Sequence, residues 1–324
     1  MTPGEFLRHL AQLNTHTRRG RRAPHKPLLL LFALGRVLRD RDRLVGYAEV
    51  DRRVGDLMRR FGLPGSAVRP QYPFRWLLSD GLWEIPRYAE LRKNASGDLY
   101  VRQLRDLGVE GGFPERVHDL LRADPGLAWR AAEEILHGHF PESLHREIRE
   151  AAGIRGERMA SEAEDASAAP TLRERELGPP SFYSYLARRR RRDPLFRGSV
   201  LDEYMERCAV CELDIRLGAQ PLGLEAAHIQ WHSHAGPDEV VNGLALCLLH
   251  HEAFDRGALG LEERKGTGFN VLVSHEVRES RGEAAGSLIE FSGRRIRSPR
   301  TASRAPAPLF VEWHSREVFR SPPL

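Results

Sequence analysis

The sequence predicts an α+β protein built from two domains. The chain has 324 residues, which is long enough for two ordinary cores. Apolar residues recur at helical spacing through the first half, and all three cysteines cluster in the second half. We expect a mainly helical N-terminal domain with a small sheet at residues 1–155, a linker at 156–182, and a smaller α+β C-terminal domain at 183–324.

The N-terminal half contains several apolar patterns of helical period. Helices are predicted for residues 6–13, 28–38, 50–61, 117–121 and 127–140. Pro27 stands in the first turn of the second of these, so His25 and Lys26 would lie at a helix N-terminus that favours anions. The Asp-Gly pair at 80–81, followed by alternating apolar residues, predicts a short strand at 82–85.

The composition changes between the two halves. Residues from about Glu157 to Pro180 lack bulky apolar side chains, which is typical of an interdomain linker. Beyond it we expect a strand at 269–274, an exposed loop at 297–308, and a final apolar segment at 309–314 that returns to the core. The net charge of +5 combines 50 basic with 45 acidic residues, so local arginine runs at 18–22 and 188–192 point to nucleic acid more than the total does.

The three cysteines form two short ligand pairs with one histidine. Cys208-x-x-Cys211 is followed by Cys247-x-x-His250, and each pair lets one turn of backbone present two ligands to the same ion. Three thiolates and an imidazole suit tetrahedral Zn²⁺. Because four protein ligands leave no open position, this zinc would be structural.

A second set of residues is interleaved with the zinc ligands. His228, Asn242 and His251 occur in the order His, Asn, His, and this pattern within a zinc bracket resembles the HNH endonucleases of the ββα-metal fold. The resemblance implies that His228 is the general base and that His251 binds a catalytic Mg²⁺ or Mn²⁺ ion. It also implies that Asn242 orients the site or contributes to the metal shell.

One position departs from the HNH pattern. Many HNH proteins have Asp or His directly before the first motif histidine, where it contributes to the metal site. This chain has Ala227, which cannot bind a metal ion. Water, Glu225 and Asp255 are the candidates for completing the shell.

The N-terminal half carries a resemblance of its own. Arg18, the sequence His25-Lys26-Pro27, and Tyr72-Pro73-Phe74 followed by Asp-Gly-Leu-Trp resemble the sulfur-binding domain of type IV restriction endonucleases that act on phosphorothioated DNA. In that family the domain precedes an HNH nuclease, as the order is here. The resemblance implies that Tyr72, Pro73 and Trp76 form apolar walls around the sulfur. It also implies that Arg18, His25 and Lys26 donate hydrogen bonds to the phosphate oxygens. The family has a small residue at the position of Trp76.

Simple energetics show that such a pocket can distinguish phosphorothioated DNA from ordinary DNA. Burying about 40 Å² of sulfur surface contributes about 1 kcal/mol. Placing a phosphate oxygen in the same apolar patch costs about 1–3 kcal/mol of lost solvation. The sum of about 2–4 kcal/mol corresponds to a preference of about 30- to 1000-fold.

The sequence therefore predicts a modification-dependent restriction endonuclease that binds phosphorothioated double-stranded DNA and cuts nearby. We expect a cytoplasmic protein without a membrane segment, and a homodimer, because one HNH site cuts one strand at a time. Two alternatives stay open: a modified-DNA binding module whose HNH domain is inactive or regulatory, and a general HNH nickase with a protein-binding N-terminal domain.

Overall fold

The computed structural model describes residues 1–13, 17–18, 21–22, 24–62, 67–154, 194–264, 268–279 and 287–324. The predicted linker at 156–182 and the arginine run at 188–192 lie outside these ranges. The described residues contain no helix that is both long and apolar enough to cross a membrane.

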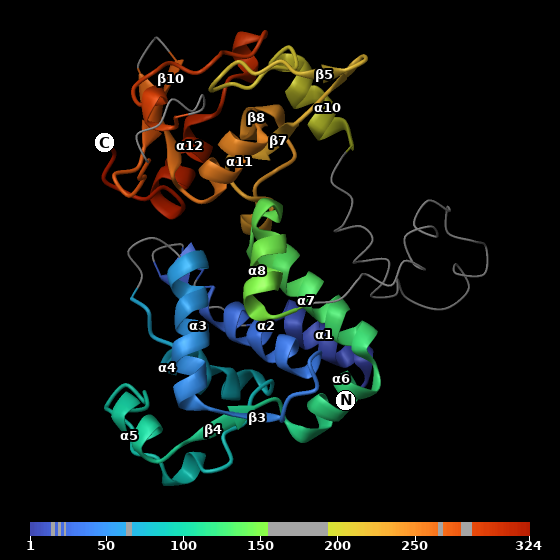
Figure 1. Ribbon diagram of the computed structural model, residues 1–324, viewed down its shortest axis with the longest axis vertical. Helices are drawn as coiled ribbons and strands as arrows, with labels where there is room; N and C mark the ends of the chain where they lie inside the picture. Colours follow the sequence, from blue (N-terminus) through green and yellow to red (C-terminus); the bar gives the residue numbers. More distant parts are fainter. Residues whose placement is uncertain are drawn as a thin grey trace, which may run out of the picture.

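The N-terminal domain is organised around one buried helix, α2 (His25–Val37), which lies between the other helices (Figure 1). It packs against α3 (Tyr47–Phe61), α4 (Gln71–Trp76), α7 (Pro125–His139) and α8 (His145–Ala152). Because neighbours cover it on several sides, its leucines are buried all round the helix. The surrounding helices are amphipathic and turn their polar faces outward.

The remaining elements of this domain are short. The helices are α1 (Pro3–Ala11), α5 (Val101–Asp106) and α6 (Glu115–Ala123), with 3-10 turns η1 (Leu77–Asp80), η2 (Tyr88–Glu90) and η3 (Glu142–Leu144). Two antiparallel pairs supply the small sheets: β1 (Thr17–Arg18) with β2 (Arg21–Arg22), and β3 (Leu44–Gly46) with β4 (Glu110–Gly112). The predicted helices are thus confirmed, with ends shifted by a few residues.

The strand predicted at 82–85 is wrong. In this described segment only Glu84 pairs with another strand, through a single bridge to Gly112. The apolar alternation has another cause: Trp83 turns into the core and approaches β4 closely. A Cβ on Gly111 would lie 2.6 Å from the Trp83 Nε1 atom, so the indole requires a glycine there.

An antiparallel hairpin and one helix form the centre of the C-terminal domain. β7 (Leu224–His228) pairs with β8 (Gly243–Cys247), and α11 (Leu248–Asp255) begins directly after β8. Helix α10 (Pro194–Glu203) packs against both strands. The order strand, strand, helix is the predicted ββα arrangement.

The other elements of this domain surround that centre. They are β5 (Arg216–Leu217), β6 (Gln220–Pro221), η7 (His232–His234), η8 (Val240–Asn242), β9 (Leu259–Arg264), β10 (Gly268–Val273), η9 (Ile289–Phe291), η10 (Ala302–Arg304) and α12 (Pro308–Glu317). The predicted strand at 269–274 is confirmed as β10. The segment at 309–314 returns to the core within α12, as expected, because Phe310 and Val311 are buried.

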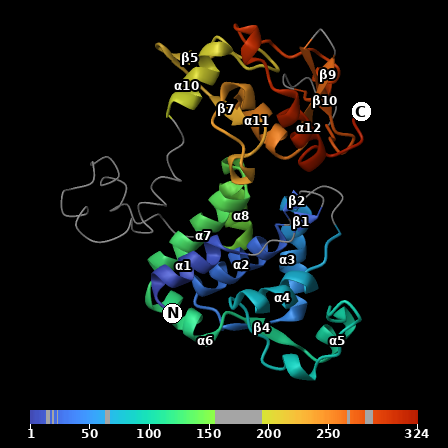
Figure 2. The ribbon, with the colours of Figure 1, turned by 180° about the vertical axis from the view of Figure 1, so that it is seen from behind.

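The two domains have separate hydrophobic cores, and the described residues of α7, η3 and α8 contact the C-terminal domain. In both ribbon views the η3–α8 corner of the N-terminal domain lies against the C-terminal domain (Figure 1 and Figure 2). Ser143 of η3 donates a hydrogen bond to Asp255 of α11, and Glu147 of α8 pairs with Arg256. The N-terminal domain therefore contacts the helix that carries His251.

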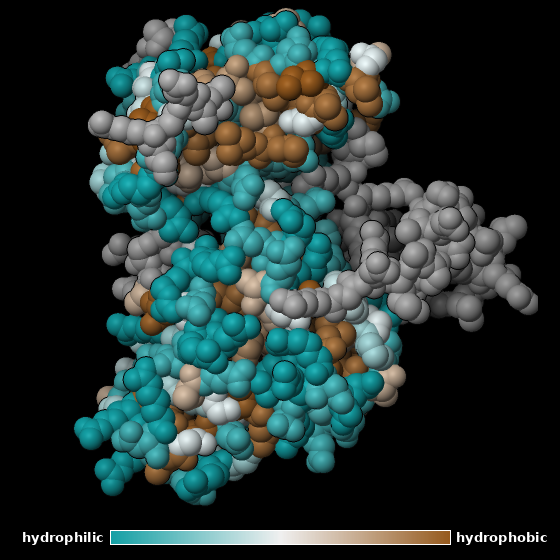
Figure 3. All heavy atoms as spheres, viewed as in Figure 1, coloured by the Kyte–Doolittle hydropathy of each residue, from teal (hydrophilic) through white to brown (hydrophobic). Residues whose placement is uncertain are grey.

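The two domains also differ in surface character. On the face in Figure 3 the N-terminal domain is mostly hydrophilic, whereas apolar side chains gather on the C-terminal domain. The exposed large apolar residues around the β5–β6 hairpin and the first turn of α11 are Ile215, Leu217, Leu222, Leu248 and Leu249.

Candidate functional site

The four predicted zinc ligands come together. The sulfur atoms of Cys208, Cys211 and Cys247 and a ring nitrogen of His250 all lie within 4.8 Å of one another. Cys211 Sγ and Cys247 Sγ are 3.9 Å apart, and His250 Nδ1 lies 3.4 Å from Cys208 Sγ and 3.2 Å from Cys247 Sγ. A tetrahedron with Zn–S bonds of about 2.3 Å has S···S edges of about 3.8 Å, so the donor set and its size fit zinc.

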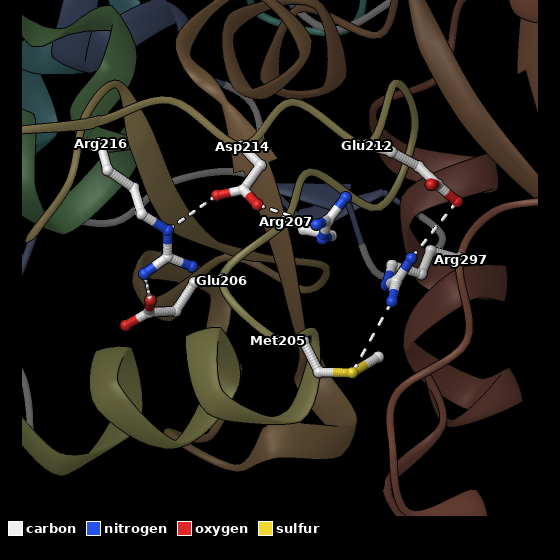
Figure 4. Close-up of polar contacts among 7 residues, drawn as sticks. All are labelled: Met205, Glu206, Arg207, Glu212, Asp214, Arg216 and Arg297. Carbon is white, nitrogen blue, oxygen red and sulfur yellow. Dashed lines mark hydrogen bonds and ion pairs between the residues drawn. The ribbon is translucent and has the colours of Figure 1, made fainter. Parts of the chain in front are cut away.

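Ion pairs hold the loop that presents the first two cysteines. Arg216 Nε lies 2.9 Å from Asp214, whose other oxygen lies 2.9 Å from Arg207 (Figure 4). Arg297 pairs with Glu212 at 3.4 Å on the other side of the loop. Such partly exposed pairs contribute little individually, but together they restrict a loop that also turns through a positive φ of 58° at Glu212.

His251 lies between two carboxylates. Its Nδ1 is 2.6 Å from an oxygen of Glu225 on β7, and its Nε2 is 3.2 Å from Asp255 one turn along α11. Burial disfavours the charged ring, but the hydrogen bonds to Asp255 and Glu225 outweigh that effect and raise the pKa of His251 to about 10. The nitrogen and carboxylate oxygen atoms that hold a proton this strongly also attract a divalent cation, so the proton and the cation compete for this site.

The two carboxylates differ in exposure. Asp255 is buried and also accepts a hydrogen bond from Trp231 Nε1 at 3.1 Å, whereas the Glu225 side chain is 46% exposed. Glu225 stands two residues before Ala227, so the alternation of a strand places both on the same face of β7. Ala227 has no ligand atom to offer on this face, whereas Glu225 supplies a carboxylate oxygen there.

His228 ends β7 and has partners of its own. Its Nε2 is 2.7 Å from Asp238 Oδ1, and its ring stacks on Phe196 of α10 with centroids 4.2 Å apart and an interplanar angle of 15°. Gly243 lies directly opposite His228 in the hairpin. A Cβ there would lie 2.5 Å from Val200, so this glycine lets α10 approach closely enough for the stacking.

Asn242 is fully buried and uses both ends of its amide. Its Oδ1 accepts from the backbone N–H of Gln230 at 2.8 Å, and its Nδ2 donates to the carbonyl oxygens of Gln230 and Pro237, each at 3.0 Å. These bonds close the loop between β7 and β8. Both ends of the Asn242 amide are therefore bonded to backbone groups of this loop.

The N-terminal candidates occupy neighbouring helices, α2 and α4. Lys26 Nζ forms a 2.6 Å ion pair with Asp80, and both side chains are nearly buried. His25 is partly buried, which lowers the pKa of its imidazole, so near pH 7 it offers a neutral N–H rather than a positive charge. Arg18 lies in β1, and its side chain is outside the described part of the chain.

The predicted apolar walls all lie on α4, but they differ in exposure. Trp76 is 38% exposed, and its Nε1 donates to Asp98 at 3.2 Å. Tyr72 is partly exposed and its hydroxyl accepts from Arg69 at 2.6 Å, whereas Pro73 is buried. Tyr72 and Trp76, four residues apart, share the outer face of the helix, and Pro73 faces inward.

The structure adds a cationic residue that the sequence reasoning missed. The guanidinium of Arg75 lies 4.5 Å from the centroid of the Trp76 ring and 4.9 Å from that of Tyr88. Lys93 lies 4.1 Å from the centroid of Tyr88 as well. Arg75 stands between Phe74 and Trp76 in the sequence, and these aromatic neighbours could have indicated it as a candidate binding residue.

Comparison with known proteins finds a matching family for each of the two domains. Residues 3–157 match the family of ScoMcrA-like DNA sulfur-binding domains, and residues 208–262 match an HNH endonuclease family. The chain joins a DNA sulfur-binding domain to an HNH domain. No functionally curated protein matches it.

Several solved structures are similar to the chain. The sulfur-binding domain of ScoMcrA complexed with phosphorothioated DNA is 27% identical with a TM-score of 0.41, and the match covers 45% of this chain and 98% of that one. The corresponding domain of SprMcrA, also complexed with phosphorothioated DNA, is 26% identical with a TM-score of 0.41, covering 48% of this chain and 95% of that one. The type IV phosphorothioation-dependent restriction endonuclease ScoMcrA is 17% identical with a TM-score of 0.39, covering 78% of this chain and 95% of that one.

The sequence-predicted residues of the HNH domain thus form two groups on one hairpin and helix. His251 lies with Glu225 and Asp255, while His228 lies with Asp238, and Asn242 closes the loop that carries Asp238. Among the described candidates of the sulfur-binding domain, Lys26 is engaged by Asp80, Pro73 is buried, and Tyr72 and Trp76 share the outer face of α4. Asp238 was missed because an acidic residue in a polar loop carries no motif signal.

Proposed function

We propose that the chain is a modification-dependent, type IV restriction endonuclease. The sulfur-binding domain would select phosphorothioated double-stranded DNA, and the HNH domain would hydrolyse a phosphodiester bond nearby. The observation that carries this proposal is the pairing, in one chain, of the two matched domains with a complete Cys₃His cluster and two motif histidines held by carboxylates.

Recognition is assigned to the outer face of α4 and the start of α2. Tyr72 and Trp76 would offer apolar surface to the sulfur, which is larger and a weaker hydrogen-bond acceptor than oxygen. Arg75, which lies against Trp76, would place a cation beside that surface for the remaining phosphate oxygens. Arg18 and His25 remain candidate donors, and Lys26 would act only if DNA displaced it from Asp80.

The catalytic cation is assigned to Glu225 and His251 Nδ1. Buried Asp255 would hold the opposite nitrogen, Nε2, as a proton donor, so that Nδ1 presents its lone pair toward Glu225. A bound Mg²⁺ or Mn²⁺ ion supplies stabilisation of negative charge on the phosphate and the leaving oxygen. In this assignment Glu225 replaces the ligand that Ala227 cannot provide.

His228 is assigned as the general base. It would take a proton from water, and the resulting hydroxide would attack phosphorus while the bond from phosphorus to the 3′ oxygen breaks. The leaving oxygen takes its proton from solvent water, and His228 returns its own proton to solvent. Zinc at the Cys₃His cluster has no part in these steps; it would tie the 208–211 loop to the start of α11.

Cleavage of both strands requires two such sites, so we propose that two copies of the chain act on one duplex. Sedimentation velocity with and without phosphorothioated DNA measures this directly. A single copy on the DNA together with complete double-strand cleavage would contradict it.

The nuclease is tested by incubating the full chain with matched duplexes, with and without one phosphorothioate linkage, in the presence of Mg²⁺ or Mn²⁺. We expect cleavage of the modified duplex only. His228→Ala should abolish cleavage with nearly unchanged DNA affinity, because a general base acts in the transition state. His275→Ala, a histidine of the same domain that contacts the backbone of Pro322, is the matched control and should cleave normally.

The same duplexes discriminate between the alternatives. Selective binding without cleavage under any metal condition would favour a binding module with an inactive HNH domain. Equal cleavage of both duplexes would favour a general nickase. Tyr72→Ala should weaken binding to the modified duplex specifically, whereas Tyr100→Ala, which removes a 51% exposed tyrosine from the same domain, should leave both affinities unchanged.

A further inference from the structure

We propose that Asp238 is the positioning residue of the general base. This inference rests on the proposed nuclease function and adds to it a carboxylate from the β7–β8 loop, outside the His-Asn-His pattern. Asp238 Oδ1 lies 2.7 Å from His228 Nε2, a distance typical of a charge-assisted hydrogen bond. Because the carboxylate can only accept, the neutral ring in this contact carries its hydrogen on Nε2.

That hydrogen bond fixes which ring nitrogen does the chemistry. With its hydrogen on Nε2, the imidazole has its lone pair on Nδ1, and Nδ1 is therefore the atom that takes the proton from water. After the transfer the ring is positively charged, and Nε2–H then points at a negative oxygen. Asp238 thus favours the correct tautomer before the reaction and stabilises the imidazolium during it, as the carboxylate does in a Ser-His-Asp triad.

The surrounding residues restrict both partners. Only 6% of the His228 side chain is exposed, and stacking on Phe196 prevents the ring from tilting. Asn242 donates to the carbonyl of Pro237, the residue directly before Asp238, at 3.0 Å. A Cβ on Gly236 would collide with the carbonyl of Gln230, so the loop closes too tightly there for another residue type.

Asn242 therefore acts at a distance from the reacting atoms. It anchors both ends of the loop, at Gln230 and at Pro237, and so sets the position of Asp238 relative to His228. Asn242 thus positions the loop, the loop positions Asp238, and Asp238 orients the base His228. This gives the middle residue of the motif a physical role that does not require contact with metal or DNA.

The experiment compares Asp238→Asn and Asp238→Ala with Glu239→Gln in the full chain. Glu239→Gln removes the same charge at the neighbouring exposed position and is the matched control. We expect Asp238→Ala to lower kcat for the phosphorothioated duplex by about 10²- to 10⁴-fold, with KM and DNA affinity changed by less than about threefold. Asp238→Asn, which keeps the shape of the side chain, should also lower kcat, and Glu239→Gln should not.

A spectroscopic measurement separates positioning from general loss of structure. Long-range ¹H–¹⁵N correlations report which nitrogen of each histidine carries hydrogen, and the His228 signals are identified by their absence in His228→Gln. Wild-type protein should show the Nε2–H form of His228, and Asp238→Ala a mixture of both forms. The melting temperature and zinc content of the variant should match those of wild type.

Two results would overturn the proposal. One is an Nδ1–H form of His228 in the wild type, which can be observed even if the chain cuts no DNA. The other is an Asp238→Asn variant that is folded and cleaves within about threefold of the wild-type rate. If His228→Ala itself cuts normally, the assignment of the base fails; if the wild type cuts nothing, the proposed function fails and the tautomer measurement still decides the contact.

Discussion

Replacing Asn242 by alanine distinguishes a structural from a catalytic role for the middle residue of the motif. The change removes three hydrogen bonds and leaves three backbone groups, the N–H and C=O of Gln230 and the C=O of Pro237, without this partner in a buried loop. Each unsatisfied buried group costs about 1–3 kcal/mol, so we expect a loss of about 3–6 kcal/mol after some relaxation. Domains have a total stability of about 5–15 kcal/mol, so the loss is a large fraction.

The assay is calorimetry of the full chain. We expect the transition of the C-terminal domain to fall by about 10–20 °C while the N-terminal transition stays in place. The C-terminal transition is identified as the one that a zinc chelator lowers. Gln230→Ala is the matched control, because it removes one side-chain hydrogen bond from the same loop, to the carbonyl of His234, and should cost about 1 kcal/mol.

A different outcome would refute the loop argument. If Asn242→Ala melts within about 2 °C of the wild type and yet loses cleavage, Asn242 acts on the cation or the DNA and does not act through the loop. Loss of stability and of the Nε2–H form of His228 together would support the argument, since the first follows from the unsatisfied loop groups and the second from a displaced Asp238.

Three further predictions concern other parts of the chain. Cys247→Ser should abolish stoichiometric zinc in elemental analysis and loosen the C-terminal domain, and an unchanged melting curve would exclude structural zinc. Glu147→Gln should weaken the contact between the domains and enlarge the molecule in small-angle scattering, because Glu147 pairs with Arg256; Glu150→Gln, at an exposed pair on the same helix, should not. Burial lowers the pKa of His145 to about 4 despite its hydrogen bond to a backbone carbonyl, so the fold favours the neutral ring. Its contribution is therefore present above about pH 6.5 and is lost as the pH falls toward 4, by about 1.4 kcal/mol per pH unit, which urea denaturation at several pH values measures against His145→Gln.

The sequence alone identified the two domain types and the candidate metal ligands. The candidate zinc ligands come in pairs three residues apart, so local backbone geometry nearly brings each pair together before any tertiary contact forms. The same holds for His250 and His251 on one helical turn, and for the leucines of α2, whose unbroken run predicts a buried helix. These signals are local, and local signals survive in a single sequence.

The tertiary structure decided which groups each functional side chain meets. Lys26 pairs with Asp80 across 54 positions, His251 meets Glu225 across 26, and Ser143 reaches Asp255 across 112. No periodicity encodes such distances, because they depend on how helices pack and how loops close. The strand prediction at 82–85 was wrong for the same reason: an apolar alternation is satisfied equally by a strand and by an irregular segment that turns into the core. Spacing along the chain identifies the candidate ligand residues, whereas packing determines which groups they bond. A buried polar group needs a hydrogen-bond partner, and the tertiary structure determines which partner lies within reach.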